Sequence, residues 1–168
     1  QEVGGAGLSH LDFALVEREL GRGSMALNHF FGRPQNILMA CQGDQREKYL
    51  LPAVRGDRMD ALAMTEPEVA GSDPTLIQTK AYPDGDEWVI NGHKWFSSNA
   101  SVADILIVMV KTNLDEDASP YQAFSMIVVP TDAPGVNIVR DVPTMGEPDH
   151  RTGEPGGHAE ILYEDVRV

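Results

Sequence analysis

Apolar positions in the first part of the chain recur at the spacing of a helix. Leu8, Leu11 and Leu15 lie three or four residues apart, as on one face of an amphipathic helix. Ser9 can cap this helix, and Asp12 stands at the position that completes a capping box. The pattern therefore predicts a helix that ends at the glycines just after residue 20.

Two more helical segments are predicted before residue 60. One begins near Pro34, a residue suited to a first helical position, and is stopped by Gly43. The other opens at Asp44 and is interrupted or ended by Pro52, which has no N–H to donate. We expect the helical part to end near Arg55–Asp60.

From about Ala61 the pattern changes to short apolar or alternating runs of strand length between turn residues. Asn91-Gly92 separates two such runs and predicts a two-residue hairpin turn. Polar or Gly/Pro-rich loops are expected at Asn113–Pro120 and Gly146–Gly157. The expected strands are Leu76–Tyr82, Glu87–Ile90, His93–Phe96, Ile105–Thr112, Ala123–Val129, Val136–Arg140 and Ala159–Tyr163.

Short strands at this spacing favour an all-β barrel or sandwich. The predicted fold class is α+β, with a helical segment over residues 1–58 and a β domain over residues 59–168. The chain starts without a methionine and stops directly after a strand-like segment, so we expect both ends to be cuts through a longer protein.

Composition narrows the classes of partner. Apolar residues make up 42% of the 168 positions, enough for a core. The formal net charge of −13 disfavours nucleic acids and anionic membrane surfaces, although local groups can still bind an anion. The longest apolar run, Ile105–Val110, is too short to span a bilayer. With Cys41 as the one cysteine, no internal disulfide can form, which favours a reducing compartment.

The polar segment Thr65–Asp73 has two interpretations. In the structural one, Ser72 or Asp73 caps a short helix that begins at Pro74. In the functional one, the N–H groups of the helix start suit a pyrophosphate, and Gly71 permits close approach of the backbone. A carboxylate would repel such an anion, so we expect Asp73 to point into the cap.

The segment Trp95-Phe96-Ser97-Ser98 also has two interpretations. Trp95 can pack in the core of a hairpin, which is the commoner role of a strand tryptophan. It can instead lie beside a flavin, with Ser97 bonded to the polar edge of the ring, since a planar cofactor needs an apolar wall and few fixed polar groups.

These two segments resemble the flavin-binding signatures of the acyl-CoA dehydrogenase family. The first is similar to Thr-Glu-Pro…Gly-Ser-Asp and the second, Gly92-His93-Lys94-Trp95-Phe96-Ser97, to Gly-x-Lys-x-Trp followed by a hydroxyl residue. Four further segments resemble the family in the same order, so the similarity covers nearly the whole chain: Glu19–Arg22, Tyr49–Gly56, Thr131–Val136 and Tyr163–Val168.

The resemblance implies the end of an N-terminal helical domain followed by a β-barrel domain that binds FAD and acyl-CoA, with a C-terminal helical bundle absent. It implies that Leu62–Ser72 line the FAD, that Thr65 touches the isoalloxazine ring, and that Ser72 also lies near the acyl-CoA. The cofactor-binding residues it implies are Leu62, Ala63, Met64, Thr65, Glu66, Gly71, Ser72, Trp95, Phe96 and Ser97.

The chain departs from the commonest family pattern in three places. Thr65–Asp73 is one residue longer than the frequent form, Leu62 stands where an aromatic is often found, and Ser97 replaces the usual threonine. The longer loop, with Gly157–Ile161, resembles a branch whose animal members can be fused to a phosphotransferase-like domain. Acyl-chain specificity stays open.

The family chemistry is α,β-dehydrogenation of a fatty acyl-CoA, in which a carboxylate removes the α-proton and FAD accepts the hydride. No residue here matches the family's usual base, so none is assigned as catalytic, and Glu66 and Glu68 are expected to be structural or solvated. Two alternatives stand: a non-catalytic β-barrel binding module or degenerate homologue, and an acyl-CoA oxidase-like relative.

Other chemistry finds little support. The five histidines show no ligand spacing, so no metal site is predicted. Cys41 is expected to be a buried, inert thiol. The resemblance implies an electron-transfer flavoprotein or similar acceptor as partner and a homo-oligomeric full-length protein. It also implies a cytoplasmic location in a bacterium, or a mitochondrial or peroxisomal one in a eukaryote.

Overall fold

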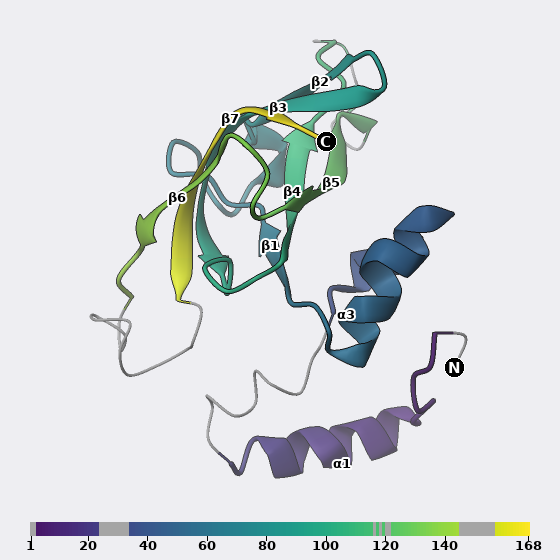
Figure 1. The fold of residues 1–168 in the computed structure, drawn as a ribbon. Helices are drawn as coiled ribbons and strands as arrows, with labels where there is room; N and C mark the ends of the chain where they lie inside the picture. Colours follow the sequence, from purple (N-terminus) through teal and green to yellow (C-terminus); the bar gives the residue numbers. More distant parts are fainter. Residues whose placement is uncertain (1–2, 24–33, 116, 118, 120–121, 145–156) are drawn as a thin grey trace.

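The computed structural model describes residues 3–23, 34–115, 117, 119, 122–144 and 157–168. Helical segments at the N-terminal side lead into one strongly curled β-sheet, a half-barrel, as Figure 1 shows. The expected α+β class, a helical segment followed by a barrel-like sheet, is therefore confirmed. Within the described residues, no helix combines the length and apolar character that a membrane crossing requires.

The first helix, α1 (His10–Leu20), begins as the capping pattern predicts. The Ser9 side chain accepts a hydrogen bond from the Asp12 N–H, and the Asp12 carboxylate accepts one from the Ser9 N–H. Gly21 ends the helix, with its N–H on the Glu17 carbonyl. None of the α1 side chains is buried, and Figure 1 shows the helix lying away from the sheet.

The helix predicted from Pro34 to Gly43 is wrong. That stretch holds only a 3₁₀ turn, η1 (Asn36–Ala40), in which the Cys41 N–H donates to the Leu38 carbonyl. Leu38 is the one buried side chain of the turn and packs beside β4 of the sheet. The packing of Leu38, rather than the spacing of apolar residues, determines the backbone conformation of this stretch.

The third predicted helix is interrupted, as expected. A π turn, η2 (Arg46–Leu50), comes immediately before the α-helix α3 (Leu51–Arg55), whose first turn contains Pro52. Proline lacks the N–H that a continuous α-helix would use there, so the irregular turn falls just upstream. Gly56 ends α3 in the left-handed region, at φ +79°.

Seven strands form the sheet, in the order β1-β4-β2-β3-β7-β6, with β5 paired to β4. β1 runs parallel to β4, and the β2–β3, β3–β7, β4–β5 and β6–β7 pairs are antiparallel. The strands are β1 (Asp60–Ala63), β2 (Lys80–Asp84), β3 (Glu87–Ser98), β4 (Ile105–Lys111), β5 (Phe124–Pro130), β6 (Val136–Asp141) and β7 (His158–Arg167).

The hairpin turn predicted at Asn91-Gly92 is wrong. β3 continues straight through these residues, and the turn lies at Gly85-Asp86, with Asp84 opposite Glu87. Gly92 instead allows β3 to pass close to the side chain of Thr79, because a Cβ at position 92 would lie 2.5 Å from the Cβ of Thr79.

Asn91 sits beside a break in the pairing between β3 and β7. Its side chain donates to the carboxylate of Asp165 and accepts from the Asp165 N–H, at 2.9 and 3.0 Å. The strand register shifts between Ile90 and Gly92. A β-bulge can use the same small residues as a turn, so composition alone did not separate the two.

The apolar run of β4 is buried on both faces. Leu106 and Val108 face the core inside the curled sheet, whereas Ile105 and Ile107 pack against the helical segment that contains Leu50. A strand covered on both sides has a continuous apolar sequence, as Ile105–Val110 has. The second of these two cores, which contains Leu50, Ile105 and Ile107, joins the helical segment to the sheet.

The structure describes only parts of the two predicted loops. Residues 113–115 have no regular structure, in agreement with a loop. The loop predicted at Gly146–Gly157 lies outside the described residues except for Gly157.

Candidate functional site

The two signature segments meet at the end of β1. The chain leaves β1 through Met64 and Thr65, and the Trp95 N–H of β3 donates to the Thr65 carbonyl at 3.0 Å. Gly71 returns to the same place, since a Cβ on it would lie 3.2 Å from the Thr65 Cγ2. Ser72 follows on an exposed position. The structure thus brings Thr65 and Gly71 of the first segment together with Trp95 of the second.

A β-bulge in β3 sets the directions of the aromatic pair. The register with β7 shifts between Lys94 and Ser97, and Phe96 takes a left-handed φ of +52°. The rings of Trp95 and Phe96 lie 4.7 Å apart at 56° to each other. A non-glycine residue in this conformation is strained, and such bulges often re-aim side chains at functional sites.

Ser97 lies on the inner side of this bulge. It is buried, and its hydroxyl has no hydrogen-bond partner within the described part of the chain. A buried hydroxyl without a partner costs stability, so such a group calls for an explanation such as a bound polar ligand.

Asp73 points into a cap, as expected. Its carboxylate accepts from the Thr75 N–H and hydroxyl at 3.0 and 2.6 Å, and these hydrogen bonds hold the pKa of the exposed carboxyl below its usual value. The element that it caps, η3 (Pro74–Leu76), is a 3₁₀ turn of three residues. A pyrophosphate held by the N-terminus of a regular helix therefore finds no support here, because a single turn adds little dipole.

Three of the expected cofactor residues, Ala63, Glu66 and Ser97, have buried side chains. Ala63 is in the core inside the curl, and Glu66 is 2% exposed and bonded to Lys94, Thr79 and the Gln78 backbone. Any contact from Ala63 or Glu66 to a ligand would therefore come from the backbone. The side chains of Leu62, Met64 and Thr65 are partly buried.

Glu66 is held in its ionised form. Burial raises the pKa of its carboxyl, but the hydrogen bonds from Thr79, Lys94 and the Gln78 backbone outweigh that effect and bring the pKa below its usual value. Burial likewise lowers the pKa of Lys94, and the Glu66 carboxylate works against that change.

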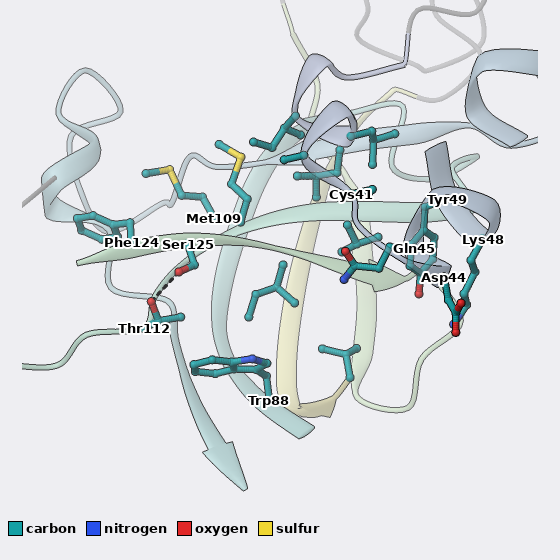
Figure 2. A pocket seen from close by; sticks show the side chains of 18 of the residues that line it. Cys41, Asp44, Gln45, Lys48, Tyr49, Trp88, Met109, Thr112, Phe124 and Ser125 are labelled. Carbon is teal, nitrogen blue, oxygen red and sulfur yellow. Dashed lines mark hydrogen bonds between the residues drawn. The ribbon is translucent and has the colours of Figure 1, made fainter. Parts of the chain in front are cut away.

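A separate apolar hollow of about 1010 Å³ lies between the helical segment and the β4–β5 face of the sheet. Figure 2 shows Tyr49 and Lys48 on the helical side, Met109 and Phe124 from the strands, and Trp88 nearby. None of the ten residues expected to bind a cofactor lines it. The hollow and the signature segments are therefore two different features.

The residues present around Trp95 suit a flavin. The partly buried indole offers a flat apolar wall, the buried Ser97 hydroxyl has no partner among the described residues, and Gly71 allows the backbone to approach Thr65 closely. No group of three or more potential metal ligands occurs within the described ranges.

Reasoning from the sequence missed two features of this region. One is Lys94, whose ammonium is fully buried, because lysine in a strand normally reaches solvent. The other is His93, whose ring nitrogens lie 3.0 Å from Glu68 and 2.9 Å from Glu160. The Gly-x-Lys spacing could have pointed to Lys94, but its acidic partner lies 28 positions away.

Comparison with known proteins agrees with this geometry. The family model for the acyl-CoA dehydrogenase middle domain matches residues 61–157, and that for the N-terminal domain of the same family matches residues 1–57. FadE2 of Mycobacterium tuberculosis, named as a probable acyl-CoA dehydrogenase, is 43% identical over 148 residues, which cover 87% of this chain and 32% of the relative.

Solved structures share the fold. An acyl-CoA dehydrogenase from Geobacillus kaustophilus superimposes with a TM-score of 0.79 at 30% identity, over 99% of this chain and 43% of that one. A glutaryl-CoA dehydrogenase from Mycobacterium smegmatis, solved in complex with FADH2, gives a TM-score of 0.74 at 25% identity, over 100% of this chain and 41% of that one. The chain thus spans about a third to two fifths of the length of these relatives, and it belongs to the acyl-CoA dehydrogenase family.

Proposed function

We propose that this chain forms the flavin-binding part of an FAD-dependent acyl-CoA dehydrogenase that introduces an α,β double bond into a fatty acyl-CoA. Membership of the family supports an oxidoreductase role. A related glutaryl-CoA dehydrogenase was solved with FADH2, which supports FAD as the cofactor. The finer statement about substrate and reaction is our own.

The observation that carries the proposal is the convergence of Thr65, Gly71 and Trp95, with the buried, unpartnered hydroxyl of Ser97 two residues further along β3. An apolar wall with one free buried donor is what a planar, amphipathic ring requires. FAD, when bound, would supply the hydride acceptor for the reaction. In this proposal Trp95 walls the ring and Ser97 donates a hydrogen bond to its polar edge.

Ser72 has a different role in the proposal. Its position is exposed, directly after the Gly71 close approach, so its hydroxyl is open to a phosphate or to the acyl-CoA. The backbone of Leu62–Ser72 would form the rest of the cofactor wall.

Neither glutamate of the signature loop suits the role of general base. Glu66 is buried and accepts four hydrogen bonds, so its carboxylate has no path to a substrate α-proton. Glu68 is half exposed but is paired with His93. We therefore assign no catalytic residue to this chain and propose that the base lies in a C-terminal helical bundle.

The proposal extends to the organisation of the whole protein. We propose that residues 1–58 complete an N-terminal helical domain and residues 59–168 form the middle domain. The full-length protein is proposed to be a homo-oligomer that passes electrons to an electron-transfer flavoprotein or similar acceptor. We place it in the cytoplasm of a bacterium, or in mitochondria or peroxisomes of a eukaryote.

The test uses the full-length natural protein that carries these residues. It should copurify with FAD, and anaerobic addition of a saturated acyl-CoA should bleach the flavin absorbance. A colourless protein that ignores added FAD would refute the proposal and favour a non-catalytic binding module. Oxygen consumption without an added acceptor would instead identify an oxidase-like relative.

Two tryptophan variants test the wall. Trp95→Ala should lower flavin retention, whereas Trp88→Ala, which removes the chain's other indole from the hollow, should not. The flavin-to-protein ratio after gel filtration measures both. Equal retention by the two variants would contradict the role of Trp95.

Ser72→Ala tests the exposed hydroxyl. Because Ser72 is exposed, its loss should leave the apoprotein's melting temperature nearly unchanged. The rise in melting temperature on adding FAD or acyl-CoA should shrink. A full ligand-induced rise in the variant would remove Ser72 from the site.

A further inference from the structure

A fully buried ion pair lies directly beneath the junction of the two signature segments. The Lys94 ammonium donates to the Glu66 carboxylate at 2.9 Å and to the Met64 carbonyl at 2.8 Å. The Lys94 side chain is 0% exposed and that of Glu66 is 2% exposed. Taking two charges out of water is costly, so such a pair is seldom present for stability alone.

The carboxylate of Glu66 is saturated by donors from a third segment. One oxygen accepts from the Thr79 N–H at 2.9 Å and from the Thr79 hydroxyl at 2.5 Å, besides the bond from Lys94. The other oxygen accepts from the Gln78 N–H at 2.7 Å. The pair therefore joins the end of β1, the entry to β2 and the middle of β3 at one point.

The neighbours of the pair are the residues proposed to touch the cofactor. Thr65 precedes Glu66, Trp95 follows Lys94, and the two neighbours share a backbone hydrogen bond of 3.0 Å. Successive side chains of an extended chain point to opposite faces. A lysine held on the inner face therefore directs the adjacent indole of Trp95 outward.

A second set of polar contacts, made by His93, lies on the outer face of the same loop. His93, on the other side of Lys94, lies 3.0 Å from Glu68, and its second ring nitrogen lies 2.9 Å from Glu160 of β7. The contact between His93 and Glu68 is partly exposed, so solvent weakens the interaction. The inner pair is shielded from water and carries more of the geometric restraint.

We propose that Lys94 and Glu66 are positioning residues that set the separation between Thr65 and Trp95, and with it the width of the slot that takes the flavin ring. This inference rests on the proposed function, because it concerns the same site. Neither side chain touches the cofactor, because both are buried. Both act through the backbone hydrogen bond between Trp95 and Thr65 and through the bulge that follows it.

The pair can be removed without leaving a lone charge. The double variant Lys94→Met/Glu66→Gln keeps side chains of similar length and deletes both charges, a replacement that buried ion pairs often tolerate. Breaking only one partner would strand a buried charge and unfold the site, so single variants are not informative. Arg167→Met serves as control, since it breaks exposed ion pairs with Asp84 at the end of β2 and with Glu87 at the start of β3, away from Lys94.

The experiment titrates FAD into the apo form of the full-length protein and measures three quantities. These are the dissociation constant, the fluorescence of the bound flavin, which stacking on Trp95 should quench, and the melting temperature of the apoprotein. For the double variant we expect a tenfold or greater rise in the dissociation constant, about 1.4 kcal/mol. We also expect brighter bound flavin and a melting temperature within a few degrees of the natural protein's, and no change in any quantity for Arg167→Met.

Each other result overturns a definite statement. Unchanged affinity and fluorescence in a folded double variant overturn the positioning role and leave the proposed function intact. Failure of the natural protein to bind FAD overturns the proposed function and this inference with it.

If the double variant does not fold, Thr79→Val tests the inference instead. This variant removes one hydrogen-bond donor to Glu66 and keeps the β-branched shape of the side chain. A threefold or greater rise in the dissociation constant then supports the inference. An unchanged constant refutes it.

Discussion

Replacing Gly92 with alanine would press a methyl group into the side chain of Thr79. An ideal Cβ at position 92 lies 2.5 Å from the Thr79 Cβ and closer still to its hydroxyl and methyl. Thr79 is buried and cannot swing into solvent. Its hydroxyl is also bonded to the Glu66 carboxylate, so any shift of the side chain breaks that bond.

Two costs add in the Gly92→Ala variant. Overpacking a tight interior site costs about 1–3 kcal/mol. Loss of a hydrogen bond to a buried charged group adds about 1.5–3 kcal/mol. We therefore expect the free energy of unfolding to fall by about 2.5–6 kcal/mol.

Guanidinium denaturation followed by tryptophan fluorescence measures the change. Thr79→Gly supplies the matched background, because it removes the Cβ, the hydroxyl and the methyl that the new side chain would meet. In that background Gly92→Ala should cost less than half as much, a strong coupling between neighbours. A loss below about 1 kcal/mol for the single variant, or simple additivity of the two, would refute the close packing of β3 on residue 79.

Three further predictions concern the two cores. Tyr163 buries a hydroxyl that has no partner among the described residues, so Tyr163→Phe should be neutral or up to about 1 kcal/mol more stable at neutral pH. Burial raises the pKa of Tyr163, so the stability that its neutral phenol contributes is complete below the unfolded pKa of about 10 and is lost as the pH rises above it. The stability advantage of Tyr163→Phe should therefore grow when denaturation is repeated at increasingly alkaline pH. A constant difference in stability between the two proteins would contradict this. Leu50→Ala, at a side chain 1% exposed, should cost about 2–5 kcal/mol in urea denaturation, whereas Leu114→Ala at an exposed position should cost less than about 0.5 kcal/mol. Burial raises the pKa of Cys41, so a maleimide should label its thiol slowly in the native state and rapidly in denaturant, and equal rates would show that the thiol is open.

Features that depend on neighbouring residues were predictable from the sequence. The Ser9–Asp12 capping box, the cap formed by Asp73 and the positions of most strands follow from contacts within a few residues. Local hydrogen bonds and the period of apolar side chains determine such features.

Features that depend on contacts between residues far apart in the chain could not be predicted from the sequence. Asn91-Gly92 looks like a turn, but Thr79 and Asp165 bring it into the middle of a strand. Leu38 looks like part of a helix, but its packing beside β4 leaves only a 3₁₀ turn. In each case the energy of a long-range contact exceeds the weak local preference.

The candidate site divides in the same way. The amino-acid sequence by itself determined which hydroxyls, glycines and aromatics the chain offers, and their likeness to a family. Only the tertiary structure decided that Thr65 bonds to Trp95, that the Ser97 hydroxyl is buried without a partner in the described part, and that Lys94 is an interior charge. The physical reason is that burial and pairing are properties of segments brought together by folding, and no local pattern records which distant residue will remove a charge from water.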